Sequence, residues 1–196
     1  MTLTPGNQVV SHPHPKLGGD FDNNVVMALS HALNAMGVAT VRFNTRGVGT
    51  SRGSSSWFGV AEREDAKAAV AFAWTLPGVT KLLLCAYSFG AAVGASAVFA
   101  KPPSAIALVG YPRGFWAWFL FSSHYAALDT VGLGRVPKLL VLGEHDNFTS
   151  VATLEAMFAT MDEPKRMEII PGADHFFFGR EHLVAAVLVD WLRPLL

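Results

Sequence analysis

The sequence predicts one α/β domain, with a mostly parallel sheet of about six strands and helices on both of its faces. Short apolar runs alternate with helix-like segments along the whole chain, which is the pattern of right-handed strand–helix–strand crossovers. The runs are apolar throughout and mostly do not alternate with polar residues, as in strands that are covered on both faces. The length of 196 residues fits a single domain with a sizeable core.

The individual elements follow from these patterns. Strands are expected at residues 9–10, 38–43, 82–86, 105–109, 138–142 and 166–170. The first helix should begin after an N-cap at Asp22 or Asn23 and end at Gly37. Further helices are expected at about 61–74, 89–100, 150–161 and 180–192, with the charged residues from Glu62 to Lys67 facing water.

Charge and cysteine content exclude several classes of function. Lysine plus arginine and aspartate plus glutamate number 15 each, so no basic field is available for nucleic acid or anionic lipid. One cysteine, Cys85, allows no internal disulfide. The first eight residues lack the features of a signal peptide, and the aromatic run 115–121 is too short to span a membrane. We therefore expect a cytoplasmic protein.

The chain is organised around Ser88, which follows an apolar strand and precedes an alanine-rich helix. Small residues stand two positions before and after it, as a sharp strand-to-helix turn requires. Asp146 and His175 come after later strands, and the carboxyl ends of the strands meet at one edge of such a sheet. A neutral histidine can take the serine proton, and a carboxylate fixes the histidine tautomer. The pattern predicts Ser88 as nucleophile, His175 as base and Asp146 as the acid.

Other interpretations exist for each of these residues. Ser88 could be a helix N-cap, which is a common use of serine at a strand–helix junction. His175 could be a loop histidine that bonds only to the backbone. Five further residues compete for the roles of base and acid: Asp129, Glu144, His145, Asp174 and His182.

Stabilisation of an oxyanion requires two preorganised N–H donors. The backbone N–H of Phe89 follows the nucleophile and is the first candidate. The second is the backbone N–H of His14, because the prolines on both sides of it have none. His12 and His14 could instead bind a metal, but two histidines without a third ligand are a weak signal, and we expect no metal and no other cofactor.

The motifs resemble the α/β-hydrolase superfamily, and most closely its small, nearly lidless, dienelactone-hydrolase-like members. The resemblance covers nearly the whole chain. Ala86 replaces the usual first glycine of the nucleophile turn, and Ser88 replaces the cysteine of the dienelactone enzymes. The motifs are residues 12–15, 18–19 and 22–24, then 42–44 and 46–51, then 86–90, 143–146 and 172–177.

The resemblance implies a serine hydrolase that cleaves carboxylic ester or thioester bonds of small substrates through an acyl-enzyme. A non-catalytic binding or scaffold protein on the same fold and a small serine peptidase are the alternatives. The superfamily sheet normally begins with an antiparallel hairpin, and only eight residues precede Val9, so we expect that hairpin to be absent. An open sheet edge would favour a homodimer.

A short cap-like insertion is expected at about 111–135, where the superfamily inserts its cap. We expect its aromatic residues to line the substrate pocket, or else to form a buried helix or a dimer contact. Arg46 could contact a substrate anion, but an arginine that ties a glycine-rich turn is the stronger interpretation. The expected pocket residues are Tyr87, Tyr111, Phe115, Trp116 and Phe119.

Overall fold

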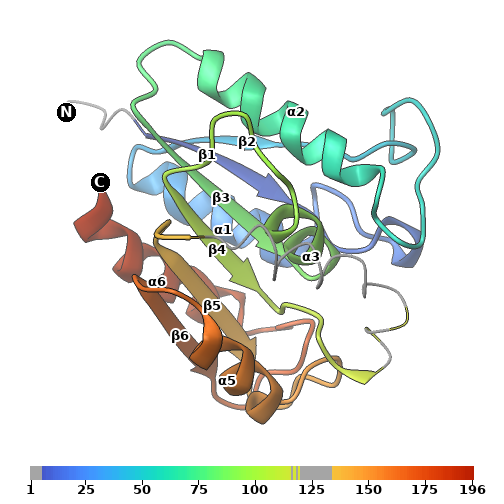
Figure 1. Cartoon of the computed structure of the whole chain (residues 1–196), viewed down its shortest axis with the longest axis vertical. Helices are drawn as coiled ribbons and strands as arrows, with labels where there is room; N and C mark the ends of the chain where they lie inside the picture. The colour runs from blue at the N-terminus through green and yellow to red at the C-terminus, as the bar shows by residue number, and fades with distance from the viewer. Residues whose placement is uncertain (1–5, 116, 118, 120–133) are drawn as a thin grey trace.

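A single sheet of six parallel strands forms the centre of the molecule, in the order β2-β1-β3-β4-β5-β6 (Figure 1). This parallel sheet confirms the predicted fold class. The computed structural model describes residues 6–115, 117, 119 and 134–196. The strands are β1 (Gly6–Ser11), β2 (Ala39–Arg42), β3 (Lys81–Tyr87), β4 (Ala105–Val109), β5 (Lys138–Gly143) and β6 (Lys165–Ile170).

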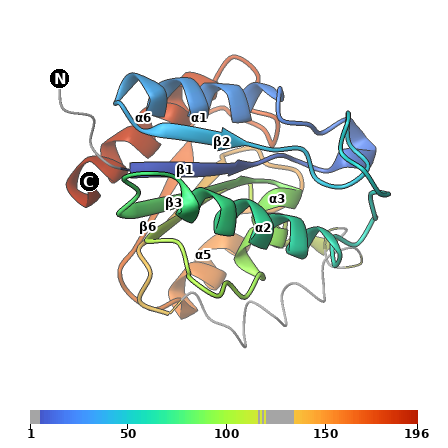
Figure 2. The ribbon, with the colours of Figure 1, turned by 90° about the horizontal axis from the view of Figure 1, so that it is seen from above.

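Helices cover both faces of the sheet (Figure 2). On one face, α1 (Asn24–Ala35) and α6 (Glu181–Leu192) enclose a core that contains Leu29 and Leu188. On the other face, α2 (Glu62–Thr75), α3 (Phe89–Ala95) and α5 (Val151–Thr160) enclose a second core around Leu84. The central strands β3, β4 and β5 are buried on both faces, so their residues are almost all apolar without alternation, whereas the edge strands β2 and β6 are only partly buried.

Local sequence signals set most element boundaries. The Asn23 side chain accepts a hydrogen bond from the Val25 N–H at 3.0 Å, which caps α1, and Gly37 follows this helix with φ +81°. Two expectations were wrong. The helix after Ser88 ends at Ala95, well before the prolines at 102 and 103. Glu62 does not face water, because its carboxylate is buried under the preceding loop.

The loop before α2 closes over Glu62. Its Oε1 accepts from the Ser56 N–H at 2.6 Å, and its Oε2 accepts from the Ser56 hydroxyl at 2.7 Å. Because Ser56 belongs to the loop before the helix, the helical periodicity of α2 cannot predict the burial of the Glu62 carboxylate.

The outer edge of β2 has no strand partner among the described residues. Pairing of this edge with a second copy stays a prediction. Within the same described residues, no helix is both long and apolar enough to cross a bilayer.

Candidate active site

The backbone at Ser88 adopts a conformation that is rare for a residue with a side chain. Its φ is +54° and its ψ is −119°, between the end of β3 and the start of α3. The Ser88 N–H donates to the Val109 carbonyl at 2.8 Å, which ties the turn to β4. Ser88 stands at the N-cap position of α3, but its side chain makes no capping hydrogen bond there, so the interpretation of its hydroxyl as a helix cap is wrong.

Glycine at position 90 allows this turn to approach the end of β1. A Cβ at Gly90 would lie 2.7 Å from the His12 carbonyl oxygen and 2.7 Å from Ser11 Oγ, which is closer than real contacts allow. The other small residue of the turn, Ala86, is fully buried in β3. The absence of a side chain at Gly90 therefore lets the turn at Ser88 lie close to the end of β1.

Ser88, His175 and Asp146 form a continuous chain of hydrogen bonds. Ser88 Oγ lies 2.9 Å from His175 Nε2, and His175 Nδ1 lies 2.7 Å from Asp146 Oδ2. The imidazole and the carboxylate are buried, and Ser88 is half-buried. With Nδ1–H donating to the carboxylate, the neutral imidazole presents Nε2 as an acceptor for the serine proton.

The loop from Gly143 to Ser150 orients the Asp146 carboxylate. Its Oδ1 accepts from the backbone N–H groups of Phe148 at 2.8 Å and Thr149 at 2.9 Å, which leaves Oδ2 for His175. Two hydrogen bonds to one oxygen fix the rotation of the carboxylate, so its second oxygen is aimed at the imidazole.

The competing acids and histidines lie in other environments. Glu144 Oε2 accepts from the Gly172 N–H at 2.7 Å, and Asp174 Oδ1 accepts from the N–H groups of the two residues after His175. The side chains of His145 and His182 are exposed. Asp129 lies outside the described residues.

The His175 loop rests on Tyr87, the last residue of β3. The Tyr87 hydroxyl donates to the His175 carbonyl oxygen at 2.8 Å, and the two rings lie 5.8 Å apart. Burial raises the pKa of the Tyr87 hydroxyl, so it remains a donor. Gly110 also lies against the His175 ring, since a Cβ at this position would be 3.2 Å from His175 Cε1.

His14 lies next to the residue that follows the serine. The rings of His14 and Phe89 are 4.6 Å apart. His14 Nδ1 accepts from the Lys16 N–H at 3.1 Å, and Nε2 donates to the Trp57 carbonyl at 3.2 Å. The structure therefore brings the two residues predicted as amide donors together beside Ser88.

The His12 ring holds the loop after β1 through hydrogen bonds. Its Nδ1 donates to the Pro13 carbonyl at 2.7 Å, and its Nε2 accepts from the N–H and the hydroxyl of Thr45, each at 3.1 Å. Burial lowers the pKa of His12 and of His14, which keeps both rings neutral.

The metal interpretation of these two histidines is disfavoured, since all four ring nitrogens make hydrogen bonds to protein groups. Across the part of the chain that the structure describes, no group of three or more histidine, cysteine, aspartate or glutamate residues could hold a metal ion.

Solved structures of serine hydrolases resemble this chain over nearly its full length. An α/β serine hydrolase homologue from Coxiella burnetii is 30% identical, with 97% of this chain and 86% of that chain covered and a TM-score of 0.81. The chain belongs to the α/β-hydrolase family. A lidless α/β serine hydrolase from Xanthomonas campestris is 27% identical, with coverage of 100% and 84% and a TM-score of 0.84.

Curated proteins add no activity to this assignment. An uncharacterized protein of Mycobacterium tuberculosis is 28% identical over 192 residues, which cover 91% of this chain and 67% of that protein. No family model matches the chain. The structural relatives make the chain a hydrolase of the α/β fold.

Arg46 has a structural role in this α/β-hydrolase. Its guanidinium donates to both carboxylate oxygens of Asp65 in α2, at 2.8 to 3.2 Å, and its backbone N–H donates to Oδ2 at 3.0 Å. The hydrogen bonds to Asp65 raise the pKa of Arg46. These hydrogen bonds tie the glycine-rich loop to α2, which confirms the stronger of the two interpretations of Arg46.

The predicted pocket residues fall into different places. Tyr87 and Tyr111 are buried, so their placement on an accessible wall is corrected: Tyr87 supports His175, and the Tyr111 carbonyl accepts from the Thr149 hydroxyl at 2.7 Å. Phe115 and Phe119 are exposed and lie edge to face, 5.4 Å apart. Trp116, and most of the insertion at 111–135, lies outside the described residues.

Sequence reasoning assigned no role to the phenylalanines that flank His175. Phe148 lies 4.3 Å from the imidazole, ring centre to ring centre, and Phe176 lies 5.7 Å from it. The available signal was three consecutive phenylalanines after His175 in a loop, where polar residues are the rule.

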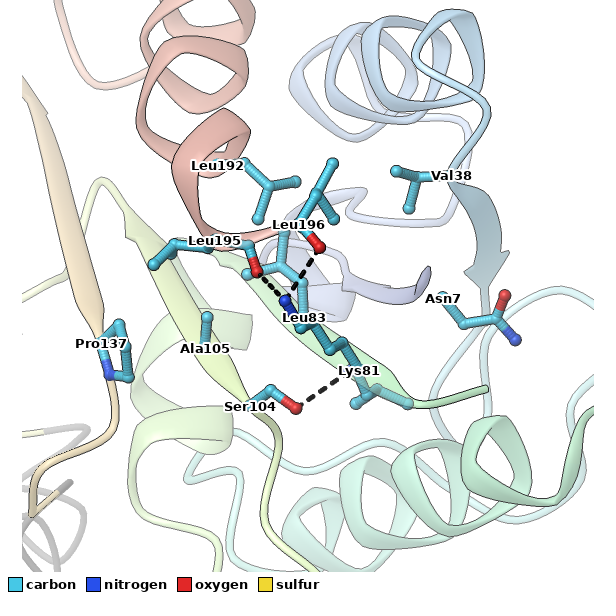
Figure 3. Close-up of a pocket in the computed structure, with 11 residues that line it drawn as sticks. Asn7, Val38, Lys81, Leu83, Ser104, Ala105, Pro137, Leu192, Leu195 and Leu196 are labelled. Atoms are coloured by element: carbon cyan, nitrogen blue, oxygen red, sulfur yellow. Dashed lines mark hydrogen bonds between the residues drawn. The ribbon is translucent and has the colours of Figure 1, made fainter. Parts of the chain in front are cut away.

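A separate cavity of about 300 Å³ lies at the other end of the sheet, near the start of β3 (Figure 3). Lys81 Nζ reaches across it and donates to the carbonyl oxygens of Leu195 and Leu196, at 2.7 and 2.9 Å. The rest of its lining is mostly apolar, from β3, β4 and the C-terminal residues. Since Lys81 already binds the C-terminal residues, this cavity offers no acid–base pair for chemistry.

Proposed function

We propose that this α/β-hydrolase cleaves carboxylic ester or thioester bonds of small substrates through an acyl-enzyme on Ser88. The single observation that carries the proposal is the hydrogen-bond chain from Ser88 Oγ through the His175 imidazole to the Asp146 carboxylate, with links of 2.9 and 2.7 Å. These are the distances at which a base can take the proton of a hydroxyl. Similarity to solved serine hydrolases supports the same assignment.

The first half of the reaction forms the acyl-enzyme. Ser88 Oγ attacks the substrate carbonyl carbon while its proton passes to His175 Nε2. Asp146 stabilises the imidazolium and keeps its orientation. The backbone N–H groups of Phe89 and His14 donate to the oxyanion. Collapse of the tetrahedral intermediate breaks the bond to the leaving oxygen or sulfur, which takes the proton from Nε2.

The second half releases the acid by the same groups. His175 takes a proton from water, the resulting hydroxide attacks the acyl carbon, and Ser88 Oγ leaves with the proton that Nε2 returns. Substrate, water, acid and alcohol or thiol balance, so this sequence needs no further reactant. A single domain with a short insertion at 111–135, as the sequence predicts, would leave the site open to small substrates.

A fluorophosphonate probe tests the nucleophile directly. We expect the probe to label the wild-type protein at Ser88, and Ser88→Ala to abolish both labelling and hydrolysis of p-nitrophenyl butyrate, by about 10⁴-fold or more in kcat. Thr149→Ser, which keeps the hydroxyl that bonds to Tyr111, serves as a conservative control near the site. A wild-type protein that is neither labelled nor active on short esters would exclude the proposal and favour a binding protein.

A panel of esters, thioesters and the matching anilides separates an esterase from a small peptidase that uses the same catalytic groups. Amides have a poorer leaving group than esters, so general acid catalysis must be stronger for them. We expect turnover of short esters and thioesters without turnover of the matching anilides. Faster cleavage of the anilides would make the protein a peptidase.

A further inference from the structure

Three phenylalanine rings run from the candidate catalytic histidine to the protein surface. Phe148 lies 4.3 Å from the His175 ring, Phe176 lies 6.4 Å from Phe148, and Phe178 stacks on Phe176 at 5.9 Å, ring centre to ring centre. We call Phe148, Phe176 and Phe178 the aromatic shelf. Phe176 is 44% exposed and Phe178 is 73% exposed, so the shelf presents apolar surface to water beside the site.

Hydrogen bonds hold the backbone that carries these exposed rings. Asn24 Nδ2, from α1, donates to the Phe176 carbonyl at 3.0 Å. The Asp174 carboxylate accepts from the N–H groups of Phe176 and Phe177 at 2.9 and 3.1 Å. Phe177 adopts a left-handed conformation with φ +55° and buries its ring near Tyr87.

The conformation of Phe177 determines which rings of the run are exposed. A bulky residue with positive φ is strained and persists only where its surroundings fix it. The strained residue directs one ring of the three into the core and its two neighbours outward. The exposed rings are therefore presented by a fixed backbone and do not belong to a loose loop.

The chemistry of the proposed reaction places one part of the substrate on this shelf. In the first half of the reaction the leaving oxygen takes a proton from His175 Nε2, so it must lie within hydrogen-bond reach of that atom. The carbon atoms attached to the leaving oxygen then lie beside the Nε2 edge of the imidazole. The Tyr87 ring beside the imidazole is buried, whereas the rings of Phe148 and Phe176 beside it lead to the surface.

We propose that the aromatic shelf binds the alcohol part of the substrate and selects esters of apolar alcohols that carry an aryl or alkyl chain. This inference rests on the proposed function, because it uses the direction of proton transfer in that mechanism. Contact with an aromatic ring favours apolar and aromatic groups through buried area and ring stacking. The acyl group lies on the other side of the carbonyl carbon and does not contact the shelf.

Three esters distinguish the alcohol side from the acyl side. Ethyl butyrate is the reference, 2-phenylethyl butyrate adds a phenyl group to the alcohol, and ethyl 4-phenylbutyrate adds it to the acyl chain. We expect kcat/KM for 2-phenylethyl butyrate to exceed that for ethyl butyrate by roughly tenfold in the wild type, measured by acid release. Phe176→Ala and Phe178→Ala should each reduce that ratio by about threefold or more, while the ratio of kcat/KM for ethyl 4-phenylbutyrate to that for ethyl butyrate stays at the wild-type value.

Phe72→Ala is the matched control, because Phe72 is 56% exposed on α2. It should leave every ratio at the wild-type value. Equal kcat/KM values for ethyl and 2-phenylethyl butyrate in the wild type would overturn the shelf assignment while the esterase proposal stands. So would shelf variants that lower kcat/KM for ethyl 4-phenylbutyrate, relative to ethyl butyrate, as much as they lower it for 2-phenylethyl butyrate. If the wild type hydrolyses none of the three esters and is not labelled by the fluorophosphonate, both the shelf assignment and the esterase proposal are overturned.

Discussion

Ser88 illustrates how single residues set the geometry of the candidate site. A left-handed conformation at a residue with a side chain costs on the order of 1–3 kcal/mol, and it persists because the surrounding structure over-determines it. The Ser88 N–H is fixed by Val109, and Gly90 allows the turn to contact the end of β1. The strained backbone points the hydroxyl at His175 and away from the helix that follows.

Gly110 gives a prediction about the imidazole position. A methyl group at Gly110 would lie 3.2 Å from His175 Cε1 and 3.3 Å from the Tyr87 ring, so the imidazole must shift. We expect Gly110→Ala to reduce kcat/KM for p-nitrophenyl butyrate by about 100-fold, because small misplacement of a catalytic group is costly.

Gly78→Ala is the control for the backbone cost of that change. Gly78 also has positive φ, at +78°, but a methyl group added there would meet no atom within 4 Å. Each alanine should lower the free energy of unfolding by about 1–2 kcal/mol in urea titrations, and only Gly110→Ala should lower activity. Equal activity losses in both variants would contradict a direct effect on His175.

At the scale of elements, the loop after β1 is held by imidazole rings. His12 joins it to the loop after β2 through Thr45, and His14 joins it to the Trp57 carbonyl. Both rings must stay neutral to accept hydrogen bonds at one nitrogen. The shape of the proposed oxyanion-binding loop is therefore linked to pH.

The sign of this dependence follows from the direction of the pKa changes. Burial lowers the pKa of His12 and His14 in the folded state below the ordinary value of about 6.5, so the unfolded chain takes up protons first as pH falls. We expect the free energy of unfolding to fall as pH decreases below about 6.5, by at most about 1.4 kcal/mol per pH unit for each histidine.

Urea titrations between pH 7.5 and 5 measure this slope. His12→Gln removes one of the two groups and should make the slope smaller, whereas His145→Gln removes an exposed side chain and should leave it unchanged. A His12→Gln slope equal to that of the wild type would show that His12 does not control acid stability.

At the scale of the whole molecule, two separate cores support the edge of the sheet that carries the candidate site. The core between the sheet and helices α1 and α6 lies below the His175 loop, and the other core supports α3 and the serine turn. Because the strands are parallel, all loops that carry the candidate site leave the same edge. Damage deep in a core should therefore affect folding more than chemistry.

Leu29→Ala tests that separation. Leu29 is fully buried between α1 and the sheet, and its truncation leaves a cavity. The free energy of unfolding should fall by about 2–5 kcal/mol, while kcat per folded molecule stays within about twofold of the wild type. Leu17→Ala, at an exposed position, should change the unfolding free energy by less than about 0.5 kcal/mol.

The sequence by itself determined the order in which strands and helices follow one another along the chain, and the residues that follow each strand. Apolar runs and helical periodicity are local properties, so they can be read without knowledge of the fold. In a parallel sheet, position after a strand is enough to bring Ser88, Asp146 and His175 to one edge. Small residues around Ser88 also reported the sharp turn, since steric limits act between near neighbours.

Only the tertiary structure decided which side chains meet. Asp146 and not Glu144 or Asp174 contacts His175, because the backbone amides around each carboxylate fix its direction. The burial of Glu62, the support from Tyr87 and the exposed shelf after His175 likewise depend on loops that pack together. Side-chain direction at a loop is set by such contacts between loops, and no periodicity in the sequence encodes it.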